Sequence, residues 1–186
     1  MEAKRLLRQS LLAQRRAMSL TEVGDFSARI TSRLLESVAA HQRVFCYASQ
    51  GNEVQTHDLI VQWLKRSVAV ALPRIMPDGS MQAVPITSWD ELSAGPHGIL
   101  QPPVATQVWD TADWCVLPCA AVTAKGHRLG RGGGHYDRWL SGHRSSRSVA
   151  LAYAWQVVDA LPIEPWDQTV DQVITETRTI GPIPTR

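Results

Sequence analysis

The sequence has no apolar run long enough to cross a membrane, and it has few cysteines. A transmembrane helix needs roughly 20 consecutive apolar residues, and no segment here approaches that length. No apolar segment with a small-residue cleavage site opens the chain, so we expect a soluble protein that is not exported. The three cysteines lack CxxC spacing. A disulfide framework and a zinc ribbon are therefore not expected, and a cytoplasmic location is favoured.

The sequence also lacks a strong net charge. Its formal charge is +2, and residues 1–16 carry five basic residues against one acidic residue, a net +4 that leaves −2 for the remainder. Nucleic-acid binding requires a broad basic face, so a small anionic ligand is the better expectation, with no nucleic-acid or membrane partner. A basic, acid-poor start is also typical of a mitochondrial transit peptide, and this alternative stays open. No oligomeric state is predicted.

The composition is that of a globular chain. Of 186 residues, 44% are hydrophobic and 19% are charged, which predicts one compact domain over residues 1–186. Hydrophobic periodicity predicts helices near 4–18, 20–38, 57–66 and 136–140, and strands at 44–47, 68–72, 81–85, 114–117, 149–154 and 173–177. The proline- and glycine-rich stretch 92–106 is predicted to be a turn-rich loop.

This order of elements predicts an α/β fold. Strands that alternate with helices favour a mostly parallel, doubly wound sheet flanked by helices, here with an N-terminal helical pair. Pro73 and Pro118 are expected to end their strands. Ser19 and Glu22 match a capping box and predict the start of the second helix.

The first predicted helix is basic and amphipathic. Lys4, Arg8 and Arg15 recur at multiples of three and four residues, so they share a face. A second face is predicted to carry Leu7, Leu11, Gln14 and Met18. The basic stripe could be a solvated helix face, which is the usual fate of such charges, or it could meet an anion.

The strongest local signal is RLGRGGGHYD at residues 128–137. Four glycines in five consecutive positions allow positive φ angles and let backbone amides approach anionic oxygens. A helix that begins near Tyr136 would add its N-terminal dipole to this attraction. Arg128 and Arg131 supply charge partners, and Asp137 supplies an oxygen ligand suited to Mg²⁺. The segment predicts a phosphate-binding loop, although an ordinary surface turn remains the simpler alternative.

Several familiar motifs are absent. No GK[ST] follows the glycines, so the loop is not a Walker A loop, and GxGxxG is matched only loosely. The six histidines show neither HxxxH nor HExxH spacing, so a histidine metal centre is not expected. No Ser-His-Asp arrangement is evident.

Six segments occur together in a recognisable order. They are AKRLLR at 3–8, QGNEVQT at 50–56, LPR at 72–74, GILQP at 98–102, the loop at 128–137 and VDQVI at 170–174. In this order they resemble the 5-formyltetrahydrofolate cyclo-ligase family, also called methenyltetrahydrofolate synthetases. The resemblance implies an enzyme that converts 5-formyltetrahydrofolate to 5,10-methenyltetrahydrofolate, hydrolyses ATP to ADP and phosphate, and requires Mg²⁺. Reduced folate and ATP are then its small-molecule partners.

The resemblance also implies roles for individual residues. The implied ATP-binding residues are Lys4, Arg5, Arg8, Arg128, Gly130, Arg131, Gly132, Gly133, Gly134, His135 and Tyr136. The implied folate-contacting residues are Glu53, Arg131, Gly132, Gly133, Gly134 and His135. Arg131 and Tyr136 are implied to be catalytic, and Asp137 and Asp171 to bind magnesium. Glu53 could instead be a loop carboxylate without a partner, and Asp171 a helix cap or turn residue.

The implied chemistry is phosphoryl transfer to the formyl oxygen. Phosphorylation turns this oxygen into part of a leaving group, and N10 of the folate then closes a five-membered ring. Such chemistry needs positioning and charge neutralisation more than a protein nucleophile.

Two positions depart from the family pattern. His135 stands where most members have an aromatic residue, and Gln101 stands where many have glutamate. Because histidine titrates near pH 6.5, His135 predicts a folate KM that varies between about pH 5.5 and 7.5.

Two other functions remain as alternatives. One is a phosphosugar isomerase-like α/β enzyme, which would need an acid/base pair beside the loop and no ATP. The other is a non-catalytic nucleotide or nucleic-acid binder that uses the basic N-terminus.

Overall fold

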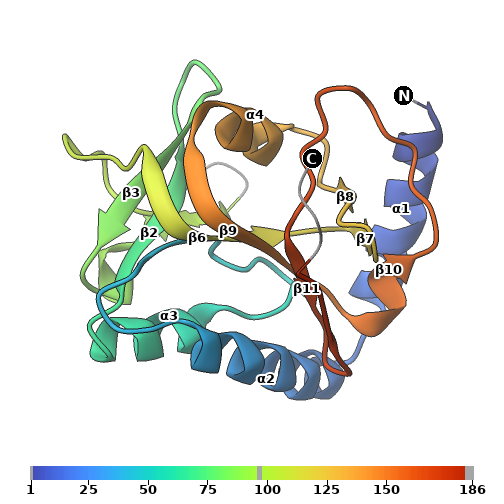
Figure 1. The fold of residues 1–186 in the computed structure, drawn as a ribbon, viewed down its shortest axis with the longest axis horizontal. Helices are drawn as coiled ribbons and strands as arrows, with labels where there is room; N and C mark the ends of the chain where they lie inside the picture. Colours follow the sequence, from blue (N-terminus) through green and yellow to red (C-terminus); the bar gives the residue numbers. More distant parts are fainter. Residues whose placement is uncertain (1, 96–97, 183–186) are drawn as a thin grey trace.

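The computed structural model describes residues 2–95 and 98–182 (Figure 1). The described chain forms a seven-stranded sheet whose strands, in spatial order, are β12 (Thr179–Ile180), β11 (Gln172–Ile174), β9 (Arg144–Leu151), β6 (Thr111–Pro118), β1 (Arg43–Cys46), β2 (Ala69–Ile75) and β3 (Met81–Ile86). Neighbouring strands are parallel except at the two edges, where β3 and β12 are antiparallel to their neighbours. The predicted mostly parallel α/β sheet is confirmed.

Helices cover both faces of this sheet. They are α1 (Glu2–Arg16), α2 (Leu20–Ser37), α3 (His57–Lys65) and α4 (His135–Gly142). Figure 1 shows α2 and α3 on one face and α4 on the other. The chain passes from β1 through α3 to β2, and from β6 through α4 to β9. Because β1 and β6 are neighbours, the two connections lead away from each other, toward opposite edges of the sheet. In α/β sheets, such a switch point leaves a crevice at the carboxyl ends of the strands.

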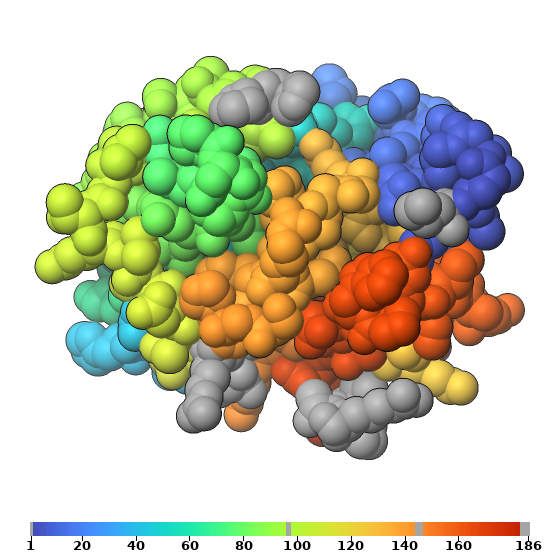
Figure 2. All heavy atoms as spheres, turned by 90° about the horizontal axis from the view of Figure 1, so that it is seen from above, coloured from blue at the N-terminus to red at the C-terminus, as the bar shows by residue number. Residues whose placement is uncertain are grey.

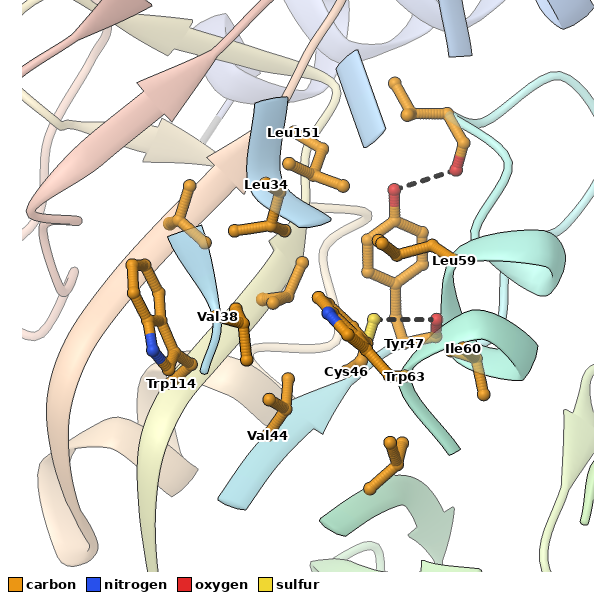
Figure 3. Packing of buried hydrophobic residues seen from close by; sticks show 14 of the residues in the cluster. Leu34, Val38, Val44, Cys46, Tyr47, Leu59, Ile60, Trp63, Trp114 and Leu151 are labelled. Atoms are coloured by element: carbon orange, nitrogen blue, oxygen red, sulfur yellow. Dashed lines mark hydrogen bonds between the residues drawn. The ribbon is translucent and has the colours of Figure 1, made fainter. Parts of the chain in front are cut away.

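The main core lies between the sheet and the α2–α3 layer. Ile30 and Leu34 of α2 and Trp63 of α3 are completely buried, and they belong to one cluster with Val44 and Trp114 of the sheet. Figure 3 shows several of these side chains meeting around β1. The predicted capping box of α2 is confirmed, because the Glu22 amide donates to the Ser19 hydroxyl and the Glu22 carboxylate accepts from the Ser19 amide.

Small elements complete the structure. A three-stranded sheet consists of β10 (Val157–Val158), β7 (Ala121–Thr123) and β8 (Arg128–Leu129), and a two-stranded hairpin consists of β4 (Ser93–Ala94) and β5 (Leu100–Gln101). The described residues also form the 3₁₀ turns η1 (Trp89–Glu91) and η3 (Ala154–Gln156). The stretch 92–106 is turn-rich as predicted apart from this hairpin, and its residues 96–97 lie outside the described residues.

The two N-terminal helices are confirmed, and they pack in different places. Leu11 of α1 clusters with Ala120, Ala121 and Leu129, whereas α2 lies beside α3. A helix turns about 100° per residue, so Lys4, Leu11 and Arg15 fall within about 40° of one another. The basic and apolar stripes of α1 therefore adjoin, and both turn toward the protein: Leu11 and Arg15 are buried.

The prediction that prolines end two strands is confirmed for Pro118 and wrong for Pro73. β6 ends at Pro118, whereas β2 continues through Pro73 to Ile75. The β1 ladder reaches only Ala71 on one side and Val116 on the other. Beyond these residues, β2 and β6 each have a free edge, where the missing proline N–H costs no ladder hydrogen bond. The short β1 thus leaves a notch in the sheet between two longer strands.

No helix in the described part of the chain is both long and apolar enough to span a membrane.

Candidate functional site

Two cavities flank the glycine-rich loop at the carboxyl ends of the strands. The apolar cavity, of about 310 Å³, opens in the notch beyond β1 and is lined by Tyr47 and Ala48 after β1, by Pro73 and Ile75 of β2, and by Pro118 of β6. The polar cavity, of about 530 Å³, lies between the loop, α1 and the segment 164–168. The cavities share three wall residues, Gly133, Gly134 and Asp137.

Figure 2 shows the arrangement around the loop from above. The orange segment that contains the loop and α4 lies between the green β2–β3 region and the blue α1. The red-orange segment near residue 165 lies beside α1. Elements from both ends of the chain thus enclose the loop that the sequence singles out.

The loop adopts a conformation that requires glycine. Gly132 has φ +109° and Gly134, the N-cap of α4, has φ +65°. A Cβ atom at Gly132 would also lie 3.4 Å from the guanidinium carbon of Arg8. Arg8 Nε donates to the carbonyl oxygen of Gly130 at 2.8 Å, which ties the loop to α1. The N-terminal end of α4 is therefore presented to both cavities with an anion-attracting dipole.

Arg128 and Asp137 form an ion pair beneath the loop. Arg128 Nη2 lies 3.0 Å from Asp137 Oδ1, and the Arg128 side chain is only 2% exposed. Arg128 Nη1 also donates to the carbonyl of Pro118 at 3.3 Å, while its buried Nε has no hydrogen-bond partner within the described structure. Asp137 Oδ1 further accepts from the amide of Gln168 at 3.3 Å. This pair joins α4 to the end of β6.

Lys4 lies in the wall of the polar cavity. Its Nζ is 2.8 Å from Glu164 Oε2 and 2.5 Å from Asp167 Oδ2, and its side chain is 11% exposed. Burial lowers the pKa of Lys4, but its hydrogen bonds to Asp167 and Glu164 outweigh that effect and raise the pKa above its ordinary value. The amine is therefore a permanent cation at neutral pH.

Arg5 lies apart from the two cavities. It is exposed on α1, where it pairs with Glu2 one turn away at 2.5 Å, and it is not among the described residues that line either cavity. Arg8 does line the polar cavity. The structure therefore brings Lys4 and Arg8 to the glycine loop and leaves Arg5 on the outside of the helix.

Glu53 is a buried carboxylate held by two guanidinium groups. Its Oε1 is 2.9 Å from Arg131 Nη2 and 3.6 Å from Arg15 Nη2, and its side chain is 6% exposed. Its Oε2 accepts from the amide of Gln50 at 2.9 Å, and Arg131 Nη1 makes a short hydrogen bond to the side-chain oxygen of Gln50. Glu53 and Arg131 line the apolar cavity, so the structure brings together two residues that are 78 positions apart in the sequence.

Tyr136 and His135 also line the apolar cavity. Burial raises the pKa of Tyr136 well above its usual value, so its phenol stays protonated and can donate a hydrogen bond. Its ring lies 6.1 Å from that of Phe45. His135 Nδ1 is 3.1 Å from Arg138 Nη2. Burial, and then the charge of Arg138, lower the pKa of His135 below 6.5.

The family resemblance predicts that His135 contacts the folate, and the lowered pKa of His135 then determines the pH range in which the folate KM should change. The His135 ring is neutral at pH 7, and the folded state opposes its protonation. Its contribution to the free energy of unfolding is therefore complete above about pH 6.5 and is lost as the pH falls through the lowered pKa. We therefore expect a KM for the folate that is constant above about pH 7 and changes only below about pH 6.5. The pH range in which the folate KM should change therefore lies lower than the range of about pH 5.5 to 7.5 expected from the sequence.

The measurement is the folate KM of wild type and His135→Tyr at several pH values. Tyrosine does not titrate in this range, so the variant should keep its activity and show a flat profile. Superimposable profiles for the two proteins would contradict a role for His135 in this cavity.

Asp171 is engaged elsewhere in the sheet. Its Oδ2 accepts from the amide of Ser148 at 2.6 Å and from the Ser148 hydroxyl at 2.8 Å, and it is not among the described residues that line the two cavities. Within residues 2–95 and 98–182, no group of three His, Cys, Asp or Glu side chains could hold a metal ion. The magnesium role of Asp171 stays a prediction.

Three residues that the structure places at the site were not assigned a function there from the sequence. Arg15 was visible as a member of the basic stripe, but nothing in the sequence indicated that it is buried beside Glu53. Glu164 and Asp167, the partners of Lys4, lie more than 150 positions from it, in a segment without a motif. Only the folded arrangement shows these contacts.

A doubly wound α/β fold that joins a basic, glycine-lined cavity to an apolar cavity is typical of enzymes that bind an anionic ligand beside an organic substrate. The model of the 5-formyltetrahydrofolate cyclo-ligase family matches residues 1–176. The chain belongs to this family and is a ligase.

Individual relatives agree with the family match. The chain is 30% identical to the 5-formyltetrahydrofolate cyclo-ligase of Mus musculus, over 94% of each chain. It is 28% identical to a probable 5-formyltetrahydrofolate cyclo-ligase of Caenorhabditis elegans, over 96% of this chain and 95% of that protein. Its fold is similar to that of the Aquifex aeolicus 5,10-methenyltetrahydrofolate synthetase, with a TM-score of 0.84, 28% identity, and 98% and 94% of the two chains covered. These matches favour the ligase interpretation over the isomerase-like and non-catalytic alternatives.

Proposed function

We propose that the protein converts 5-formyltetrahydrofolate to 5,10-methenyltetrahydrofolate, with ATP hydrolysed to ADP and phosphate. The observation that carries this proposal is the pair of cavities with a shared wall at Gly133, Gly134 and Asp137. A phosphoryl donor in one cavity and an acceptor in the other would meet at this wall. The family match supplies the reaction class, and the relatives' names supply the substrate and product.

The polar cavity is the proposed ATP site. Lys4 and Arg8 supply positive charge from α1, and the loop from Gly130 to Gly134 supplies backbone amides and the N-terminal end of α4. Arg128 supports the loop through its ion pair with Asp137. Together these groups can neutralise and orient a polyphosphate, which is the main requirement of phosphoryl transfer.

Asp137 is the proposed magnesium ligand. Mg²⁺ is usually held by one or two carboxylates together with substrate phosphates, and the carboxylate of Asp137 lies in the wall between the two cavities. The residues therefore fit a metal that arrives with the nucleotide. The ion would supply charge neutralisation of the phosphates. The Asp171 carboxylate already accepts two hydrogen bonds from Ser148, so the proposal rests on Asp137.

The apolar cavity is the proposed folate site. Tyr47, Ile75 and Met81 provide apolar surface for a flat heterocycle, and Glu53 provides an acceptor for polar ring edges. His135 lies in the same wall and, as a neutral ring, can stack on an aromatic ligand. The formyl group of a folate in this cavity would point toward the loop and Arg131.

The proposed reaction has two chemical steps. The formyl oxygen attacks the γ-phosphorus of ATP and ADP leaves, which gives an iminium phosphate. N10 then attacks the formyl carbon, the carbon–oxygen bond breaks, phosphate departs with that oxygen, and N10 loses its proton. Arg131 stabilises the charge on the transferred group, and the Tyr136 phenol, which stays protonated, donates a hydrogen bond.

Omission assays test this function. Purified protein is mixed with 5-formyltetrahydrofolate, ATP and Mg²⁺, and methenyl absorbance is followed with each component left out in turn. Product is expected only when all three are present. Equal product without ATP would overturn the proposed function.

Lys4 offers a test of the ATP site. Lys4→Ala should weaken ATP binding by about 10- to 150-fold, which corresponds to a charge-assisted bond of about 1.5 to 3 kcal/mol. The variant would also leave Glu164 and Asp167 without their cation in a cavity that is meant to accept an anion. Calorimetric titration with Mg-ATP measures the change.

Two further variants sharpen this test. Arg16→Ala removes an exposed cation from the same helix and serves as the control. Arg5→Ala tests the ATP-binding role that the family resemblance implies for Arg5, because in the described part of the chain Arg5 pairs with Glu2 on the outside of α1. We expect Arg5→Ala to weaken ATP binding far less than Lys4→Ala. Equal losses in all three variants would mean that Lys4 acts only through the net charge of the helix.

A further inference from the structure

Arg15 is a buried cation that the proposed reaction does not use. It lies in the last turn of α1 and is 6% exposed. Its Nη1 donates to the carbonyl of Cys119 at 3.2 Å, and its Nη2 is 3.6 Å from Glu53 Oε1. Burial of an arginine is costly unless the charge is paired. The carboxylate of Glu53 therefore accounts for the position of Arg15.

Glu53 is shared between two guanidinium groups of different character. The Arg15 side chain is 8% exposed and fixed by the Cys119 carbonyl, whereas the Arg131 side chain is 42% exposed and projects from the glycine loop. Arg131 has one Nη atom on Glu53 and the other on Gln50. Arg131 lines the apolar cavity and is not among the described residues that line the polar cavity, so its guanidinium has to turn away from Glu53 to meet a phosphoryl group held on the polar side.

The departure of Arg131 would leave a buried carboxylate with one partner fewer. An uncompensated buried charge is strongly unfavourable, so Glu53 on its own would retain Arg131. Arg15 supplies a second positive charge that does not move. The surroundings of Glu53 contain no other described ion-pair partner within 4 Å.

The loop that carries Glu53 is itself fixed to α1. The side-chain amide of Asn52 donates to the carbonyls of Arg15 and Met18, each at 3.1 Å. The other end of α1 carries Lys4 and lines the polar cavity. Eleven residues at 1.5 Å each separate Lys4 from Arg15, about 16 Å along one rigid helix. α1 therefore lines the polar cavity directly and is connected to the apolar cavity through the contact of Arg15 with Glu53.

We propose that Arg15 is a positioning residue that keeps Glu53 in place while Arg131 leaves it to meet the transferred phosphoryl group. This inference rests on the proposed function, because it assigns Arg131 to the phosphoryl group. It predicts that Arg15 affects the rate of turnover through Arg131, although Arg15 itself touches neither the nucleotide site nor the transferred atoms.

The experiment compares four variants by steady-state kinetics. Arg15→Gln removes the fixed charge, Arg15→Lys retains a charge, and Arg16→Gln is the matched control on the exposed neighbour. The double variant Arg15→Gln with Glu53→Gln removes both members of the buried pair, so it should fold even if the single variant does not. Denaturant unfolding of each protein reports whether it is folded.

The expected result is a change in kcat with the ATP KM unchanged. Arg15→Gln should lower kcat by about 10- to 100-fold, because Glu53 then retains Arg131. Arg15→Lys should recover most of this loss, and Arg16→Gln should match the wild type. The double variant should show a higher kcat at saturating folate than Arg15→Gln, because the neutral amide no longer retains Arg131.

The possible failures are distinguishable. If the wild type forms no methenyl product with ATP and Mg²⁺, the proposed function fails and the inference fails with it. If the wild type is active and Arg15→Gln has the same kcat, the inference alone is overturned. A rise in ATP KM as large as the loss of kcat, or a double variant slower than Arg15→Gln, would assign Arg15 a merely structural role and would also overturn it.

Discussion

Arg131→Ala is expected to lower kcat by about 10³-fold, within the range measured when an arginine or an oxyanion donor is removed from a phosphoryl- or acyl-transfer site. Arg131 lies on the glycine loop in the wall of the apolar cavity, next to the wall residues that the two cavities share. Its guanidinium is the only one of the loop that is substantially exposed, since Arg128 is buried against Asp137. For this reason the proposed function has Arg131 stabilise the negative charge that develops on the transferred phosphoryl group.

The control variant for this prediction keeps the positive charge at position 131 and changes the shape of the charged group. Arg131→Lys retains a cation but lacks the planar fork that can contact two oxygens, so its kcat should lie between those of the wild type and Arg131→Ala. Single-turnover kinetics separate the chemical step from product release. A kcat of Arg131→Ala within threefold of the wild type would remove Arg131 from the reaction.

Asp137→Asn is expected to affect both stability and metal dependence. The substitution leaves the buried guanidinium of Arg128 without its carboxylate, which should lower the free energy of unfolding by about 3 kcal/mol, the low end of the range for broken buried pairs, since Asp137 is 19% exposed. The proposed magnesium ligand is lost at the same time, so the Mg²⁺ concentration needed for half-maximal activity should rise.

Denaturant unfolding and Mg²⁺ titration measure these two effects separately. Asp58→Asn is the matched control, because Asp58 is 93% exposed in α3 and its ion pair among the described residues is with the neighbouring His57. The control should change neither quantity. A destabilised Asp137→Asn with an unaltered Mg²⁺ requirement would restrict Asp137 to a structural role in supporting Arg128.

The parallel sheet and its helices could be predicted from the sequence because each central strand is a short apolar run and each helix has a regular apolar face. Pro118 gave the correct end of β6, but Pro73 gave the wrong end of β2 for a physical reason. Pro73 lies beyond the end of the β1 ladder, where no neighbouring strand needs its N–H. The end of the β1 ladder cannot be read from the sequence, because it depends on which residues of the neighbouring strands pair with β1. Pro73 and Pro118 are both among the residues that line the apolar cavity.

The glycine loop was identifiable because its sequence signal is local: consecutive glycines, two arginines and an aspartate lie within ten residues. The contacts of Lys4 and Glu53 were not identifiable, because their partners lie at distant positions and no local pattern marks them. The three-stranded sheet was also missed. Its strands have two or three residues each, which is too short to show a periodicity of two.

The most direct test of phosphoryl transfer across the shared wall is to follow the formyl oxygen. 5-Formyltetrahydrofolate labelled with ¹⁸O in the formyl group is turned over with unlabelled ATP and Mg²⁺, and the inorganic phosphate is analysed by mass spectrometry. If the formyl oxygen attacks the γ-phosphorus, each phosphate released should carry one ¹⁸O atom. Unlabelled phosphate, with the ¹⁸O found in water, would show that ATP hydrolysis and ring closure are separate events and would contradict the account.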